Sequence, residues 1–172
     1  LKYDTLSSLH VKMHFSVNNS DVIVSNDFIR QSQWAHIALV KDSGTIKMYI
    51  NGNVQTQTSS SFSTVNFLSH SARPAIGING DNASTDKMRG YLSDVKVTIG
   101  TAEYTANFTP PTYPVSSSNA ELHIKGTDAS IIDKSQGANL KLEGTTTGST
   151  TQVKFSGSKS MYFAGSLHDK VI

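Results

Sequence analysis

Oxygen-bearing side chains gather in one polar stretch of the chain, at Asn79, Asp81, Asn82 and Asp86. Carboxylate and amide oxygens are the hard ligands that Ca²⁺ prefers, and a single loop can supply several of them. The spacing is not that of an EF-hand loop, and a polar loop that caps two strands is the alternative interpretation. The sequence therefore predicts no cofactor, with calcium in this loop as the alternative.

The histidines are poorly spaced for binding one metal ion. His10 and His14 share a face of an alternating segment, but four residues along a strand span about 13 Å, which one ion cannot bridge. His36 follows Trp34 in an apolar run and is expected to be a packed or hydrogen-bonded sheet residue. A Ser–His–Asp triad cannot be read from the order of residues along one chain.

Aromatic side chains are the groups that would stack on a sugar ring, provided that planar polar groups lie beside them. The candidates by residue type include Trp34, Tyr49, Tyr91 and Tyr104. Trp34 and Tyr91 fall on predicted strand faces, so we expect them to pack in the core. Tyr104 and Tyr113 lie in less regular segments and are the ligand-binding candidates, with local anchoring as the alternative for each.

Length favours one ordinary domain, or the pieces of two. Composition is typical of a secreted or surface-exposed β protein. The 172 residues suffice for a sizeable core, and only 16% of them are charged. A formal net charge of +2 argues against a nucleic-acid partner. The absence of cysteine removes disulfides and thiolate metal sites and favours a microbial or viral source. No apolar run approaches the ~20 residues of a membrane-spanning helix, so membrane insertion is not expected.

Alternation of apolar and polar residues predicts β-strands along most of the chain. The longest predicted strand covers residues 90–99, with an apolar face formed by Tyr91, Val95, Val97 and Ile99. Shorter strands are predicted at 9–15, 22–24, 75–78, 121–124, 140–142, 153–155 and 160–163, and a loop at 144–151. No window shows a sustained helical stripe. The pattern therefore predicts an all-β sandwich or barrel.

The stretch from Trp34 to Gly52 predicts a β-hairpin. Two apolar runs of strand length flank a Lys-Asp-Ser-Gly turn, and the second run ends in Asn51-Gly52. Asn-Gly tolerates positive φ at both central positions of a type I′ turn, whose twist matches that of paired antiparallel strands. The hairpin is therefore expected to begin an antiparallel meander.

The same stretch resembles the central signature of laminin-G-like domains in the concanavalin A-like lectin/glucanase superfamily. The similarity lies in Trp34-x-His36-x-Ala38-x-Val40, followed by Gly44-x-Ile46-x-Met48-Tyr49-Ile50-Asn51-Gly52. It continues through residues 75–77, 90–97 and 102–111, and the last of these resembles the closing motif of many such domains in bacteriophage virion proteins. The resemblance implies an antiparallel two-sheet jelly-roll β-sandwich.

The segment after this closing motif resembles the opening of such a domain, so the motifs occur in an inverted order. Three of the four prolines, Pro110, Pro111 and Pro114, lie where the two motifs meet, and they predict an extended connector over residues 109–119. We predict a laminin-G-like β-sandwich lacking its opening strands at 1–114, a linker at 115–119, and opening-type strands at 120–172. These strands either begin a second unit of a tandem array or complete the first unit, within the chain or by exchange with a neighbouring copy.

The resemblance implies a protein that holds a ligand without converting it. Glycosidases of the superfamily carry Glu-x-Asp-x-Glu on one strand, whereas this chain has only Glu103, Glu121 and Glu143 and no such motif. We therefore expect no enzymatic activity.

The expected role is a surface-exposed structural or adhesion module of a phage virion, in capsid decoration or in a tail or fibre, or of another extracellular surface. Other virion or surface proteins, neighbouring copies paired through strands, and cell-surface glycans are the expected partners. The alternatives are a carbohydrate-binding module of a secreted enzyme and an inert spacer in a tandem array.

Overall fold

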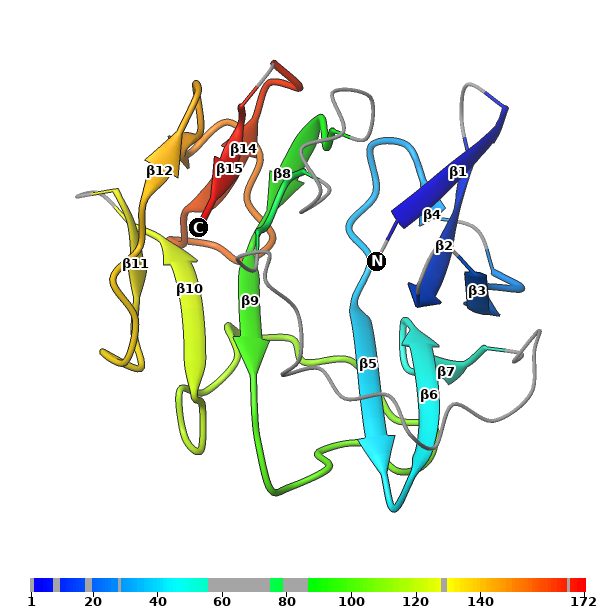
Figure 1. Cartoon of the computed structure of the whole chain (residues 1–172). Helices are drawn as coiled ribbons and strands as arrows, with labels where there is room; N and C mark the ends of the chain where they lie inside the picture. The colour runs from blue at the N-terminus through cyan, green and yellow to red at the C-terminus, as the bar shows by residue number, and fades with distance from the viewer. Residues whose placement is uncertain are drawn as a thin grey trace. The chain divides into compact units, whose positions relative to one another are not determined.

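The computed structural model describes residues 2–7, 10–17, 20–27, 29–55, 75–78, 87–127, 130–166 and 168–172. Every helix or strand assigned within these ranges is a β-strand, and all strand pairs are antiparallel (Figure 1). The predicted all-β, antiparallel class is therefore confirmed. The described residues contain no helix long and apolar enough to cross a membrane.

The chain divides into two compact units. Unit 1 comprises Leu1–Ser69 and Thr101–Pro110, and unit 2 comprises His70–Gly100 and Pro111–Ile172. Residues 70–100 therefore group with the C-terminal third, across the predicted boundaries at 114 and 119.

The described part of unit 1 contains two antiparallel sheets. The first has the order β1 (Lys2–Ser7), β2 (His10–Val17) and β3 (Ser20–Val24), with β4 (Ile29–Arg30) also paired to β2. The second has the order β5 (Ile37–Asp42), β6 (Thr45–Ile50) and β7 (Asn53–Val54). One core joins the sheets and consists of Met13, Phe15, Ile23, Ile46, Met48 and Ile50. Alternate positions of β2 and β6 supply most of this core, because successive side chains on a strand point to opposite faces.

The predicted hairpin is formed by β5 and β6. Asp42 pairs with Thr45 around the first turn, and Ser43 and Gly44 have φ angles of 47° and 84°. At the end of β6, Asn51 and Gly52 have φ angles of 49° and 82°. Two successive positive φ angles are those of a type I′ turn, so the turn prediction is confirmed.

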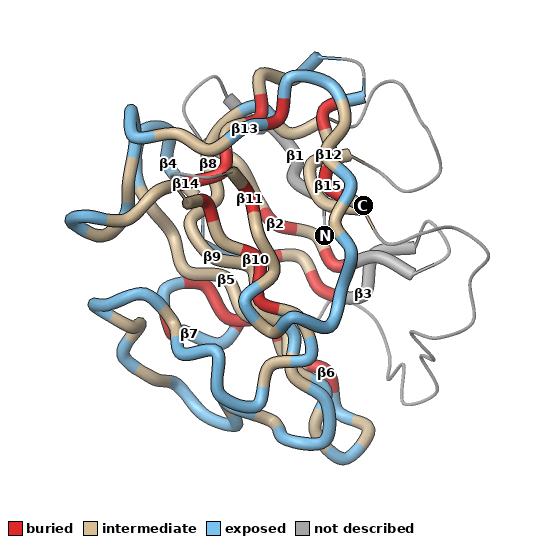
Figure 2. Tube along the Cα trace, turned by 90° about the vertical axis from the view of Figure 1, so that its left-hand side faces the viewer, coloured by how far each residue is buried: buried red, intermediate tan, exposed pale blue. Residues whose placement is uncertain are grey.

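Unit 2 is built from three small antiparallel sheets in its described part. The first has the order β11 (Ile131–Asp133), β10 (Leu122–Gly126) and β9 (Asp94–Val97). The second has the order β13 (Thr147–Ser149), β14 (Ser160–Phe163) and β8 (Gly90–Leu92). The third pairs β12 (Leu142–Glu143) with β15 (Lys170–Val171). The buried core, included in the red segments of Figure 2, consists of Ile124, Ile131, Met161, Phe163 and Val171.

Strands from both sides of the proline-rich connector share sheets in unit 2. β10 pairs with β9, with Leu122 opposite Val97. β14 pairs with β8, with Phe163 opposite Gly90. The strands that resemble the opening of a domain therefore pair with strands that precede the closing motif.

Residues 90–99 form two strands, where a single strand was predicted. β8 and β9 are separated at Ser93 and enter different sheets. Because of this break, Leu92 and Val95 both pack against the unit 2 core, although they are three positions apart. Val97 and Ile99 are instead 43% and 69% exposed. The predicted apolar face that joined them to Val95 is therefore wrong.

Two other strand predictions and one loop prediction are also wrong. Residues 75–78 make only isolated bridges, Ile76 with Val171 and Ile78 with Lys87. Residues 153–155 form no strand, whereas 147–149, predicted as loop, form β13. Thr and Ser are compatible with a strand once a partner is present, and here β14 provides it.

Candidate functional site

The four predicted calcium ligands, Asn79, Asp81, Asn82 and Asp86, lie outside the described residues. In the ranges that the structure does describe, no three His, Asp or Glu side chains are arranged to hold a metal ion. The calcium site therefore stays a prediction.

Trp34 and Tyr91 are only partly buried, and neither belongs to a core cluster. Trp34 precedes β5, which begins at Ile37. Tyr91 lies on β8 with its ring centroid 5.0 Å from that of Tyr162 on the paired strand. The expectation that both residues pack in the core is wrong, because each keeps part of its surface exposed and neither packs in a core cluster. Tyr49, in contrast, is fully buried and cannot serve as a sugar platform.

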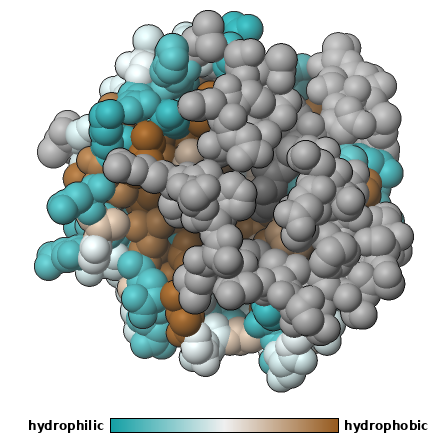
Figure 3. Space-filling model, in the orientation of Figure 1, coloured by the Kyte–Doolittle hydropathy of each residue, from teal (hydrophilic) through white to brown (hydrophobic). Residues whose placement is uncertain are grey.

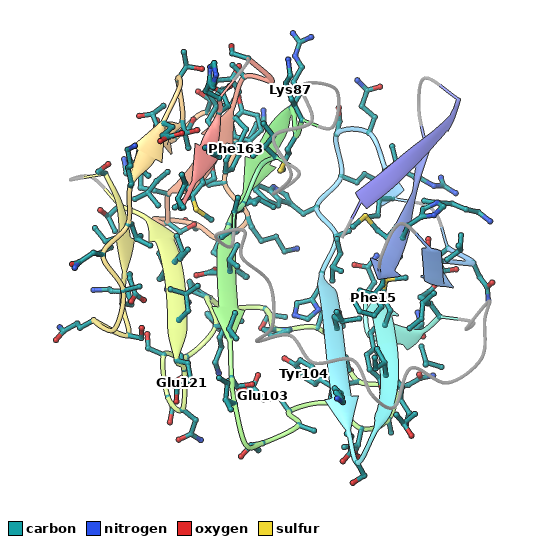
Figure 4. The ribbon with its side chains drawn as sticks, viewed as in Figure 1. Phe15, Lys87, Glu103, Tyr104, Glu121 and Phe163 are labelled. Atoms are coloured by element: carbon teal, nitrogen blue, oxygen red, sulfur yellow. The ribbon has the colours of Figure 1, made fainter. Side chains whose placement is uncertain are left out.

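Tyr104 belongs to an aromatic cluster in unit 1, and Figure 4 shows it in the segment that follows Glu103. Its ring stacks on Phe108, with centroids 3.7 Å apart and 9° between the planes. His36 contacts both of these rings edge-on. Burial, and next the negative charge of Glu103, raise the pKa of Tyr104. Because Phe108 covers one face of the ring, the geometry favours the anchoring alternative for Tyr104.

The closing motif docks on the β5–β6 hairpin through its backbone as well. The Phe108 N–H donates to the carbonyl of Gly52 at 3.0 Å, and the Lys47 ammonium donates to the carbonyl of Thr105 at 2.8 Å. A Cβ atom on Gly52 would overlap the carbonyl oxygen of Phe108. Gly52 in the hairpin signature is therefore required for two reasons, its positive φ angle and the close approach of the Phe108 carbonyl.

Tyr113 is placed very differently from Tyr104. Apolar side chains reach the surface at several points of the described residues (Figure 3). Tyr113 is 79% exposed, more than Val54, Val97 or Ile99, which are the other large hydrophobic residues exposed in the described ranges. It belongs to unit 2 and lies between Pro111 and Pro114, whose rings fix their own φ angles.

The connector that carries Tyr113 is tied to the β9–β10 pair by a chain of three side chains. Ser117 Oγ lies 2.8 Å from His123 Nδ1, and His123 Nε2 lies 3.2 Å from Asp94 Oδ1. His123 has no exposed surface, whereas Ser117 is exposed. The hydroxyl, imidazole and carboxylate thus lie in series, with the buried imidazole between an exposed serine and a partly buried carboxylate.

The charges around His123 come from three strands. The Asp94 carboxylate on β9 contacts His123 and also the ammonium of Lys125 on β10, which lies 3.4 Å away. Burial lowers the pKa of His123, the hydrogen bond to Asp94 raises it, and the positive charges of Lys125 and Lys96 lower it again, with a net lowering. On β11, Asp133 accepts the backbone N–H of His123 at 2.9 Å. The ring is therefore neutral at pH 7.

This series of side chains was not predicted from the sequence, because Asp94 lies far from the other two residues along the chain. Ser117 precedes His123 by 6 residues, and Asp94 precedes it by 29. Only the antiparallel register of β9 and β10, which places Lys125 opposite Asp94 and His123 opposite Lys96, brings the carboxylate to the imidazole. The alternation of apolar Leu122 and Ile124 with polar His123 and Lys125 was the one local signal.

Comparison with known families gives one match. A laminin-G family model, described as the concanavalin A-like lectin/glucanases superfamily, matches residues 2–101. The match covers more than half of the chain, including the β5–β6 hairpin and strands β8 and β9, and it ends before Tyr113 and Ser117. No curated protein and no solved structure shows significant similarity to the chain.

Proposed function

The chain belongs to the concanavalin A-like lectin/glucanases superfamily, and from this membership we propose that it is a lectin-like adhesion module that binds glycans without converting them. The module acts on the outside of a virion or in another extracellular setting. Its other partners are virion or surface proteins, including neighbouring copies of itself.

The observation that carries this proposal is the exposure of Tyr113. Burying an aromatic ring is favourable, so a ring left 79% exposed in a folded unit is available to a ligand. The flanking Pro111 and Pro114 restrict the backbone, so that little conformational entropy is lost when a sugar stacks on the ring. Tyr113 is thus a preorganised stacking platform.

Polar groups of the same connector complement this platform. A sugar site combines an aromatic surface with planar or hydroxyl hydrogen-bonding groups. Ser116, Ser118 and Asn119 are exposed and follow Tyr113 within six residues along the chain. The amide of Asn119 and the two hydroxyls supply both donors and acceptors.

The surroundings of Glu143 favour binding over glycoside hydrolysis at this residue. A glycosidase needs a carboxylic acid that stays protonated, with a raised pKa, to assist the leaving group. Glu143 contacts the ammonium groups of Lys141 and Lys170, and these contacts lower its pKa. A carboxylate held in its charged form by two cations is unsuited to that task.

A glycan array followed by titration calorimetry tests the proposal with three variants. Tyr113→Ala should weaken binding about fivefold or more, since a stacked aromatic contributes on the order of 1 kcal/mol or more. Tyr113→Phe should retain most of the affinity because the ring is kept. Ile99→Ala is the matched control, because Ile99 is another exposed apolar residue of unit 2. Unchanged binding by Tyr113→Ala, or binding of no glycan, would overturn the proposal.

The location is tested separately from the ligand. A virion module should be recovered with capsid or tail proteins in fixed stoichiometry after particles are purified on a density gradient. Recovery only in the soluble culture fluid, together with a secreted enzyme, would favour the carbohydrate-binding module instead.

A further inference from the structure

We propose that Ser117 is an acylation site, a serine activated by His123 that accepts an acyl group from activated carboxylic esters. This modification is separate from glycan binding at Tyr113, and it needs neither a metal nor an oxidant. The site lies entirely in unit 2 and consists of Ser117, His123 and Asp94.

The first requirement of such a site is an accessible nucleophile in contact with a base. Ser117 is exposed, and its hydroxyl lies 2.8 Å from His123 Nδ1, within the range over which a general base takes a proton. The imidazole behind it is completely buried, so water does not compete for Nδ1 from the interior side.

The second requirement is that the base presents a lone pair to the hydroxyl. An ionised carboxylate only accepts hydrogen bonds, so Asp94 Oδ1 fixes the ring proton on Nε2, 3.2 Å away. The neutral ring then turns the unprotonated Nδ1 toward Ser117, whose hydroxyl donates to it. In serine hydrolases the two ring nitrogens have the opposite partners, but either nitrogen can act as the base.

The third requirement is that the carboxylate stays in place. Asp94 Oδ1 also contacts the ammonium of Lys125 at 3.4 Å, and Ser93 donates to Asp94 Oδ2 at 3.2 Å. The register of β9 and β10 fixes the backbone on both sides of the pair. Asp94 therefore orients His123 as a positioning residue, and it does not touch the acyl donor.

The reaction needs no reactant other than Ser117, His123, Asp94 and the ester. Ser117 Oγ attacks the ester carbonyl carbon, and the Oγ–C bond forms while its proton passes to His123 Nδ1. The bond from the carbonyl carbon to the leaving oxygen breaks, and the proton on Nδ1 passes to that oxygen. An acyl-serine and a neutral alcohol or phenol result, and His123 returns to its neutral form.

Two serines of the connector serve as internal controls for acylation at Ser117. Ser116 and Ser118 flank Ser117 and are exposed as well. Among the described contacts, Ser116 Oγ accepts the backbone N–H of Ser118 at 3.1 Å, and neither hydroxyl is bonded to an imidazole. Acylation should therefore discriminate Ser117 from two serines that share its exposure and its segment.

Acylation should also depend on pH in a defined direction. The charged groups that face His123 are Asp94 and Lys96 on β9, Lys125 on β10, and Asp133 on β11 through the His123 backbone. Their combined effect with burial lowers the pKa of His123 from 6.5, so the base is already neutral at pH 7. The rate should therefore rise with pH through a midpoint below 6.5 and level off near neutrality.

The test uses p-nitrophenyl acetate on the full chain, with release of p-nitrophenol and peptide mass spectrometry as readouts. We expect one acetyl group per chain, on Ser117, formed about 100-fold faster than on Ser116 or Ser118. Ser117→Ala should abolish the fast phase, whereas Ser156→Ala should leave it unchanged, because Ser156 is an exposed serine of the same unit that lies in neither site. Asp94→Asn should shift the pH profile and slow acylation at Ser117 while the circular dichroism spectrum is retained.

Acetyl groups spread evenly over the three serines would overturn the proposal, and so would a fast phase that survives in Ser117→Ala. If Asp94→Asn does not fold, the pH profile of the unmodified chain still decides the question. A rate that rises in proportion to hydroxide, with no midpoint below neutrality, would exclude His123 as the base.

Discussion

Asp133 holds the strand that carries His123 through that residue's backbone. Its Oδ1 accepts the N–H of His123 at 2.9 Å, although Asp133 lies opposite Ile124 in the register of β11 and β10. The same carboxylate accepts the backbone N–H groups of Ser135 and Ala138, each at 2.9 Å. Burial alone would raise the pKa of Asp133, but these hydrogen bonds outweigh it and hold the pKa well below the usual range.

This lowered pKa predicts a loss of stability in acid. The folded pKa of Asp133 lies below the unfolded value of about 3.9, so its contribution is complete above that pH and is lost as the pH falls through the folded pKa. Asp133→Asn should cost about 2–3 kcal/mol at neutral pH, because an amide has one acceptor oxygen where the carboxylate has two. Urea denaturation at pH 7 and at pH 3 measures both effects. If the free energy of unfolding fell equally between pH 7 and pH 3 in the variant and in the parent, the prediction would be contradicted.

The contact between Gly52 and Phe108 predicts unequal costs for two glycine substitutions. Gly52 and Gly100 have nearly the same φ angle, 82° and 85°, so alanine at either site carries a similar backbone strain of about 1–2 kcal/mol. A Cβ atom on Gly52 would also overlap the Phe108 carbonyl, whereas one on Gly100 meets nothing within 4 Å. We expect Gly52→Ala to cost about 1–3 kcal/mol more than Gly100→Ala in thermal denaturation. Similar costs would show that the closing motif does not dock on the hairpin.

The buried hydroxyl of Tyr49 predicts a substitution that does not harm stability. The side chain is fully buried, and its Oη has no hydrogen-bond partner among the described residues. Burial, and next the negative charge of Asp42, raise the pKa of Tyr49, so it should remain neutral above pH 10. Tyr49→Phe should change the free energy of unfolding by less than about 1 kcal/mol or increase it, whereas Tyr49→Ala should cost about 3–5 kcal/mol. A clear loss of stability in Tyr49→Phe would reveal a partner for the hydroxyl.

The shared sheets of unit 2 predict the result of removing residues 120–172. Without β10 and β14, the strands β9 and β8 lose the partners to which they are bonded. Amide protons of residues 90–97 should then exchange at the rate of an unfolded peptide, and adding the 120–172 segment as a separate chain should restore protection. Protection that survives the truncation would favour a tandem array in which these strands belong to another unit. Light scattering on the full chain distinguishes self-completion, which gives a monomer, from exchange between copies.

The parts of the fold that local sequence determines were predictable. The turns at Ser43-Gly44 and Asn51-Gly52 depend on residues that tolerate positive φ, and the core positions of β2 and β6 repeat every second residue. The break at Ser93 was not predictable from 90–99 alone, because it is imposed by pairing β8 and β9 with two different C-terminal strands. β13 was missed for the same reason, since its Thr and Ser residues become a strand only beside β14.

The candidate site was predictable only in part. The irregular, proline-rich surroundings of Tyr113 marked it as a ligand-binding candidate, and the structure leaves its ring exposed. The chain of Ser117, His123 and Asp94 depends on the register of two strands separated by the whole connector, which no local pattern encodes.

The pairing of β8 with β14 also sets the order in which unit 2 can form during translation. Gly90 meets Phe163, and Ile76 meets Val171, so each contact joins residues that lie far apart along the chain. These contacts close large loops, which makes folding slow compared with that of a local hairpin such as β5–β6. Until the C-terminal strands have been synthesised, Ile76, Leu92 and Val95 lack the core residues against which they pack. Premature termination would therefore release a chain prone to aggregate.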